Sequence, residues 1–78
     1  MLYDPYEEAA ELISMLKNTH FQDYGSAIQC AMDEGATGTE IFMALRRQIE
    51  KLLAEPLMND VIKAKARRLL SEVDEALE

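Results

Sequence analysis

Apolar residues recur every three or four positions along most of the chain, and no segment alternates between apolar and polar residues over any useful length. A repeat near 3.6 residues is typical of amphipathic α-helices, which bury one face in a core. Three interruptions divide the pattern into four segments. We therefore predict four helices, at about residues 5–18, 20–34, 38–54 and 57–77.

One apolar face can be assigned to each predicted helix. The positions expected to form the core are, in chain order, Tyr6, Ala9, Leu12, Ile13, Leu16, Phe21, Tyr24, Ile28, Ala31, Met32, Ile41, Phe42, Leu45, Ile49, Leu52, Leu53, Met58, Ile62, Ala66, Leu69, Leu70, Val73 and Leu77. Short connections between helices of this kind favour antiparallel neighbours. We expect an all-α fold, a compact antiparallel four-helix bundle in a single domain.

Residues that favour helix ends support these boundaries. Asp4, Thr19 and Thr37 each have a Glu or Gln three residues later, the spacing of a capping box. Asn59 is a second possible start for the last helix. Gly35 suits a left-handed stop after the second helix. The ends of the predicted helices are therefore specified locally.

The charge of the chain is uneven. The 78 residues carry a net charge of −7, and all of this excess lies in residues 1–40, where Lys17 is the one basic residue. Residues 41–78 contain equal numbers of acidic and basic residues. Such a distribution repels a phosphate backbone and attracts a basic protein surface. We expect a protein partner with a basic surface and no nucleic acid.

The sequence contains no motif for catalysis or for a cofactor. It has no phosphate-binding glycine loop, no H-E-x-x-H and no Cys/His set with zinc spacing, and His20 is the single histidine. Cys30 is the single cysteine, so no intrachain disulfide forms, and helical phase places it on the exposed side. We expect a protein that is not an enzyme, with no metal and no cofactor.

No apolar run approaches the length of about 20 residues that crosses a bilayer, and no secretory signal peptide opens the chain. These observations indicate no membrane association. Together with the single cysteine, they favour a cytoplasmic protein.

The corner around Gly35 has the spacing of a helix-turn-helix DNA reader, with Ala31 before it and Ile41 after it. A reading helix needs Arg, Lys, Asn or Gln at the positions that reach the bases. The exposed positions that open the third predicted helix lack these residues, and Asp33 and Glu34 precede them. We interpret the corner as structural and keep a DNA-binding regulator as the last alternative.

Several residues on the solvent side of the predicted helices are candidates for contact with a partner. In the first helix, three acidic residues and an adaptable methionine face away from the core. The predicted partner-binding residues are Glu7, Glu8, Glu11, Met15, Asp33, Glu34 and Met43. By size, charge and class, we expect an acidic protein–protein interaction module, most concretely an inhibitor of the immunity or antitoxin type. An adaptor or a self-associating subunit, such as a homodimer, is the alternative in the same class.

Overall fold

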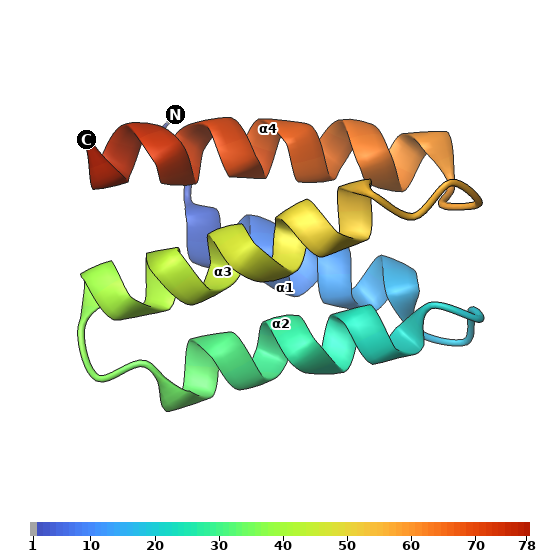
Figure 1. The fold of residues 1–78 in the computed structure, drawn as a ribbon, viewed down its shortest axis with the longest axis horizontal. Helices are drawn as coiled ribbons and strands as arrows, with labels where there is room; N and C mark the ends of the chain where they lie inside the picture. The colour runs from blue at the N-terminus through green and yellow to red at the C-terminus, as the bar shows by residue number, and fades with distance from the viewer. Residues whose placement is uncertain (1) are drawn as a thin grey trace.

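The computed structural model describes residues 2–78 and consists of four antiparallel helices (Figure 1). The helices are α1 (Pro5–Leu16), α2 (Gln22–Glu34), α3 (Gly38–Leu53) and α4 (Asp60–Leu77), and the described residues form no strand. The predicted all-α four-helix bundle is therefore confirmed.

The helices form a closed ring in which sequence neighbours are also spatial neighbours. α1 packs against α2 and α4, and α3 packs against the same two helices from the other side. One end of the bundle carries both chain ends and the α2–α3 connection. The opposite end, which we call the loop end, carries the α1–α2 and α3–α4 connections (Figure 1). The up-and-down order thus decides which segments share an end.

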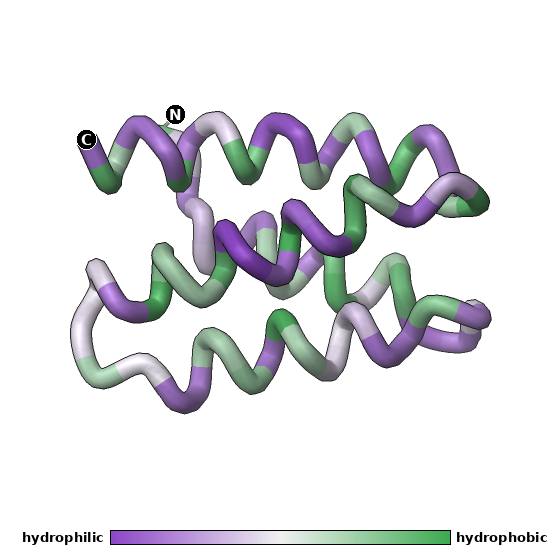
Figure 2. The backbone as a smooth tube through the Cα atoms, viewed as in Figure 1, coloured by the Kyte–Doolittle hydropathy of each residue, from purple (hydrophilic) through white to green (hydrophobic). Residues whose placement is uncertain are grey.

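The core comes entirely from the predicted apolar positions. Within residues 2–78 the buried hydrophobic side chains are Ala9, Leu12, Leu16, Ile28, Ala31, Leu45, Ile49, Leu52, Met58, Ile62, Ala66, Leu69 and Val73. Figure 2 shows the apolar and polar positions alternating along each helix with the helical period. Burial of these side chains is the dominant stabilising term for so small a fold.

Two side chains differ from their predicted environment. Tyr6, predicted in the core, is 39% exposed, and its ring lies 5.6 Å from that of Phe42. Met15, predicted to face away from the core, is half-buried and packs against it. Both positions lie at a border of the apolar face, where helical phase does not separate inside from outside.

Three of the predicted N-terminal caps are present. The Asp4 carboxylate accepts a hydrogen bond from the amide of Glu7 (3.3 Å), and the Thr37 hydroxyl accepts one from the amide of Glu40 (3.2 Å). Asn59 accepts from the amide two residues further on, at 2.7 Å. The Glu40 carboxylate accepts a hydrogen bond from the backbone amide of Ala36. In a standard capping box this hydrogen bond comes from the amide of the cap residue itself, which is Thr37 here.

The connection between α1 and α2 begins earlier and ends later than predicted. α1 stops at Leu16, because Lys17 leaves the helical region with ψ of 143°, and Asn18 after it is left-handed with φ of 62°. The Thr19 hydroxyl donates to the carbonyl of Leu16 (2.7 Å) and accepts from the amide of Phe21 (3.1 Å). The prediction that Thr19 caps the second helix is therefore wrong: Thr19 stabilises the turn. α2 begins at Gln22 instead of residue 20, and its N-cap position, Phe21, makes no side-chain capping hydrogen bond.

The prediction of a left-handed Gly35 is wrong, since its φ is −68° and its ψ is 130°. This position requires glycine for a steric reason. A Cβ atom built there would lie 2.3 Å from Cγ1 of Ile41 and 3.0 Å from its backbone. The glycine lets the chain pass directly against the first turn of α3.

The α3–α4 connection is longer than predicted. α3 ends at Leu53, and α4 begins at Asp60 instead of residue 57, directly after its cap Asn59. Leu57 consequently lies outside the helix and is 80% exposed. None of the four helices is long and apolar enough to cross a membrane, over the part of the chain that the structure describes.

Candidate protein-binding groove

The fold gathers acidic residues at one end of the bundle. This end, which we call the acidic end, comprises residues 2–10, 29–45 and 70–78, and it contains no Lys or Arg. Its ten acidic residues are Asp4, Glu7, Glu8, Asp33, Glu34, Glu40, Glu72, Asp74, Glu75 and Glu78. The remaining described residues carry five acidic and eight basic side chains. Charge is therefore divided by position along the bundle as well as by position along the chain.

Basic side chains from the middle of the bundle reach the border of the acidic end at three places. Arg46 lies 3.7 Å from the Asp74 carboxylate, and the Arg68 guanidinium stacks 4.8 Å above the Tyr3 ring. Lys65 makes the third contact, with α1. These contacts leave most of the ten carboxylates without a cationic partner in residues 2–78.

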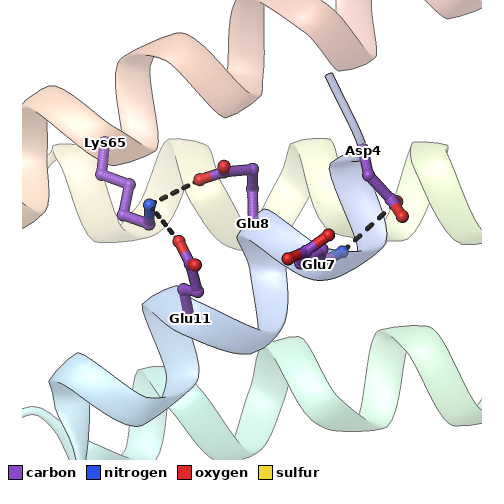
Figure 3. Close-up of polar contacts among 5 residues, drawn as sticks. All are labelled: Asp4, Glu7, Glu8, Glu11 and Lys65. Carbon is purple, nitrogen blue, oxygen red and sulfur yellow. Dashed lines mark hydrogen bonds and ion pairs between the residues drawn. The ribbon is translucent and has the colours of Figure 1, made fainter. Parts of the chain in front are cut away.

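Lys65 joins α4 to the acidic face of α1. Its Nζ donates to Glu8 at 2.5 Å and to Glu11 at 2.6 Å (Figure 3). The hydrogen bond from Lys65 holds the pKa of Glu11 below its ordinary value, and the same contacts raise the pKa of Lys65. Lys65 therefore offsets one of the three charges of Glu7, Glu8 and Glu11, and Glu7 stays exposed without an ion pair in residues 2–78.

An apolar hollow lies at the loop end, between the start of α4 and the α1–α2 turn. It has a volume of about 610 Å³. Its lining residues are Met15, Thr19, His20, Phe21, Leu57, Asn59, Val61 and Ile62. Leu57 and Val61 remain largely exposed, Val61 at 65%. Exposed apolar side chains grouped around a hollow are typical of protein contact sites.

A second, more open hollow lies along α1, with Lys65 of α4 at its side. It has a volume of about 550 Å³ and is lined by Glu7, Ala10, Glu11, Ser14, Met15 and Lys65. Met15 lines both hollows. We call the combined feature the α1–α4 groove. It is acidic near Glu7 and apolar near Val61.

Four of the predicted partner-binding residues lie together at this groove, and three lie elsewhere. Glu7, Glu11 and Met15 line it, and Glu8 is held at its border by Lys65. The exposed Asp33 and Glu34 end α2, where the Asp33 carboxylate accepts from Gln29 at 3.0 Å. Met43 is 47% exposed on α3, the helix diagonally opposite α1 in the ring. The seven residues therefore belong to three surfaces.

Sequence reasoning missed the residues that complete the groove. Phe21 was assigned to the core, and it is half-buried at the groove wall. Leu57 and Val61 were not singled out, although both are apolar residues that fall outside the stripe of Met58 and Ile62. Such extra apolar positions at the start of a helix were the one available signal.

The structure shows no further arrangement that supplies chemistry. No three His, Cys, Asp or Glu side chains in residues 2–78 are placed to hold a metal ion. Cys30 is exposed, as helical phase predicted. His20 lies at the rim of the apolar hollow. The groove and the acidic end are the candidate contact surfaces.

These features define a small helical bundle with one strongly acidic end and an amphipathic groove along one seam. No protein-family model, curated protein or solved structure matches the chain.

Proposed function

We propose that this protein is a small acidic protein–protein interaction module that binds a basic surface of a partner protein, most concretely as an inhibitor of the immunity or antitoxin type. The observation that carries the proposal is the acidic end, with ten carboxylates and no basic residue. A field of one sign accelerates encounter with an opposite surface and selects against wrong partners. The protein would act by binding and not by catalysis, in the cytoplasm.

The placement of these acids supports a role beyond folding. α2 ends in Asp33 and Glu34, and α4 ends close to Glu75, with no basic residue in the last turn of either helix. Carboxylates at a helix C-terminus oppose the helix dipole and reduce stability. A basic partner would offset this unfavourable term, because its cations would meet both the carboxylates and the negative helix ends.

The same charge argues against the alternative of a DNA-binding regulator. The α2–α3 corner lies within the acidic end, so a phosphate backbone approaching it would meet Glu34 and Glu40. An adaptor or a self-associating subunit remains the second candidate, favoured by the apolar part of the α1–α4 groove.

The proposal is tested by capture of a partner from an extract of the source cells. The protein is immobilised beside a variant with Asp33→Asn, Glu34→Gln, Glu75→Gln and Glu78→Gln. A matched control carries Asp23→Asn and Glu50→Gln, which lie outside the acidic end. We expect a basic protein to be retained by the wild type and the control, to be released by NaCl and to be lost by the fourfold variant.

Equal retention by the fourfold variant would contradict the proposal. The inhibitor version has its own measurement, namely the activity of the purified partner titrated with this protein. Loss of activity at a one-to-one ratio is expected for an inhibitor, whereas full activity in the complex would indicate an adaptor.

A further inference from the structure

We infer that the α1–α4 groove binds an amphipathic helix of a basic partner, with apolar side chains seated against Met15, Phe21 and Val61 and basic side chains beside Glu7 and Glu11. This inference rests on the proposed function and names the surface that would hold the partner once the acidic end has attracted it. The occupant is a helix, since a groove between two packed helices fits a third helix.

The apolar part of the groove supplies the anchoring site. Leu57 and Val61 are the large exposed hydrophobic residues of the loop end, and they flank a hollow whose floor includes the buried Ile62. Phe21 and Met15 form its other wall. Methionine and aromatic side chains adapt well to a bound apolar side chain and are enriched at protein interfaces.

The acidic part of the groove determines the charge of the occupant. Glu7, Glu8 and Glu11 carry three negative charges, and Lys65 supplies one positive charge between two of them. Glu7 makes no ion pair with any residue from 2 to 78. The remaining negative charge favours lysine or arginine on the partner and disfavours an acidic segment.

The length of the groove sets the spacing on the occupant. Glu7 and Met15 are eight residues apart on α1, which corresponds to about 12 Å of helix. Residues separated by seven or eight positions lie about two turns apart on one face of a helix. A partner helix with this spacing would place its apolar and basic side chains at the two parts of the groove. About three turns of helix would fill the groove from the acidic to the apolar part.

A second copy of this chain is disfavoured as the occupant. Each copy carries a net charge of −7, and no basic residue occurs in its acidic end. A symmetric pair that shared the groove would bring the two sets of Glu7, Glu8 and Glu11 together, and the net charge of each copy opposes association at low ionic strength. A segment from a basic partner has no such repulsion.

The probe for the experiment is a synthetic helical peptide of about 14 residues, with two leucines and two lysines placed two turns apart on one face. One control peptide has the same composition in scrambled order, and another has glutamate in place of lysine. Binding is followed by fluorescence anisotropy and by ¹H–¹⁵N NMR titration. We expect shifts at Met15, Phe21 and Val61, and an affinity at least about tenfold above that of the scrambled peptide.

Protein variants locate the site. The double variant Leu57→Ser with Val61→Ser removes two exposed side chains, so it should keep the fold and weaken peptide binding by about tenfold. Leu2→Ser is the matched control, because Leu2 is 95% exposed at the opposite end of the bundle, and its affinity should not change. Circular dichroism and thermal unfolding confirm that each variant is folded.

The variant Lys65→Met tests whether Glu8 and Glu11 bind a partner or only hold α4 against α1. It removes both ion pairs to α1 and therefore lowers stability, yet it frees Glu8 and Glu11 for the lysines of the peptide. We expect the affinity to increase several-fold and to depend more steeply on NaCl. If these acids serve only to hold α4 against α1, the variant will lose stability and gain no affinity.

Three results would overturn the inference: equal binding of the scrambled or glutamate peptide, an unchanged affinity in the Leu57 and Val61 double variant, or sedimentation that shows this protein dimerising through those two residues. Failure here is distinct from failure of the proposed function. A captured basic protein that depends on the acidic end but not on Leu57 and Val61 would leave the proposed function standing. If the peptide binds the groove but no captured protein depends on the acidic end, the groove is a binding site and the proposed function is wrong.

Discussion

At the scale of single residues, two glycines serve different purposes in and after α2. Gly25 is buried against α1, and a Cβ atom built there would lie 3.5 Å from Cβ of Leu16, which is an ordinary van der Waals distance. Gly25 therefore lies where α2 passes close to α1. Gly35 differs, because the same added atom would overlap Ile41. A methyl group fits at one site and not at the other.

Gly25→Ala should raise the free energy of unfolding by about 0.5–1 kcal/mol, because alanine loses less backbone entropy in a helix and makes ordinary contacts here. Gly35→Ala should lower it by about 1–3 kcal/mol through the overlap with Ile41. Urea unfolding of the two variants beside the wild type measures both changes. If both variants changed the free energy of unfolding by the same amount in the same direction, local helix propensity, and not the space around each glycine, would govern these positions.

At the scale of elements, the seam between α1 and α4 depends on a polar contact as well as on apolar packing. Lys65 bridges Glu8 and Glu11 across this seam, whereas the other seams have no such bridged pair within the described residues. The contact is partly exposed, so solvent and salt weaken it. Its contribution to stability is therefore conditional on pH and ionic strength.

Acidification should weaken this seam. The pKa of Glu11 is held below its ordinary value of 4.5 by the hydrogen bond from Lys65, so the folded state binds fewer protons there than the unfolded state. The resulting stability is present above pH 4.5 and is lost as the pH falls below that value. Glu11→Gln should lose less stability between pH 7 and pH 3.5 than the wild type, as measured by urea unfolding. An identical loss in both proteins would contradict this assignment.

The helix ends provide a second prediction at this scale. Glu34 is the last residue of α2, where a carboxylate opposes the helix dipole, whereas Glu40 lies in the first turn of α3 and accepts from the amide of Ala36. Glu34→Gln should therefore stabilise the fold by about 0.3–1 kcal/mol, and Glu40→Gln should destabilise it by a similar amount. Thermal unfolding at low salt should show shifts of about 1–8 °C in opposite directions. A melting temperature that falls in both variants would contradict the prediction.

At the scale of the whole molecule, the antiparallel order sums the charges of four segments at one end. Six of the eight acids of residues 1–40 are joined there by Glu72, Asp74, Glu75 and Glu78, which belong to the half of the sequence with no net charge. The expected excess of negative charge is thus present, but it lies at one end of the bundle and is not confined to residues 1–40. Repulsion among the carboxylates of the acidic end therefore reduces the stability of the folded state.

Salt should therefore stabilise the protein. Raising NaCl from about 10 mM to about 300 mM shortens the screening length from roughly 30 Å to well under 10 Å, which reduces repulsion among the ten carboxylates. We expect the melting temperature to rise, even though the Lys65 contacts weaken. The fourfold variant Asp33→Asn, Glu34→Gln, Glu75→Gln and Glu78→Gln should show a smaller rise. A melting temperature that falls with salt in the wild type would mean that attractive pairs outweigh the repulsion.

The helices, their caps and the buried face were determined by local sequence. A residue such as Leu45 or Leu69 lies in the core because its helical phase aligns it with neighbours three and four positions away. Asp4, Thr37 and Asn59 cap their helices through amides two or three positions further on. Interactions of such short range can be deduced from spacing alone. The exceptions, Asn18 and Gly35, lie where the chain leaves a helix and contacts decide the path.

Only the tertiary structure decided which surfaces the protein presents. Lys65 meets Glu8 and Glu11 across more than fifty residues of sequence, and Met15 lines the same hollow as Val61 because α1 and α4 are neighbours in the ring. The acidic end likewise exists because four helix ends that are distant in sequence lie together. Spacing along one helix carries no information about which helix lies opposite. For this reason the apolar core was predictable, whereas the groove and the acidic end required the fold.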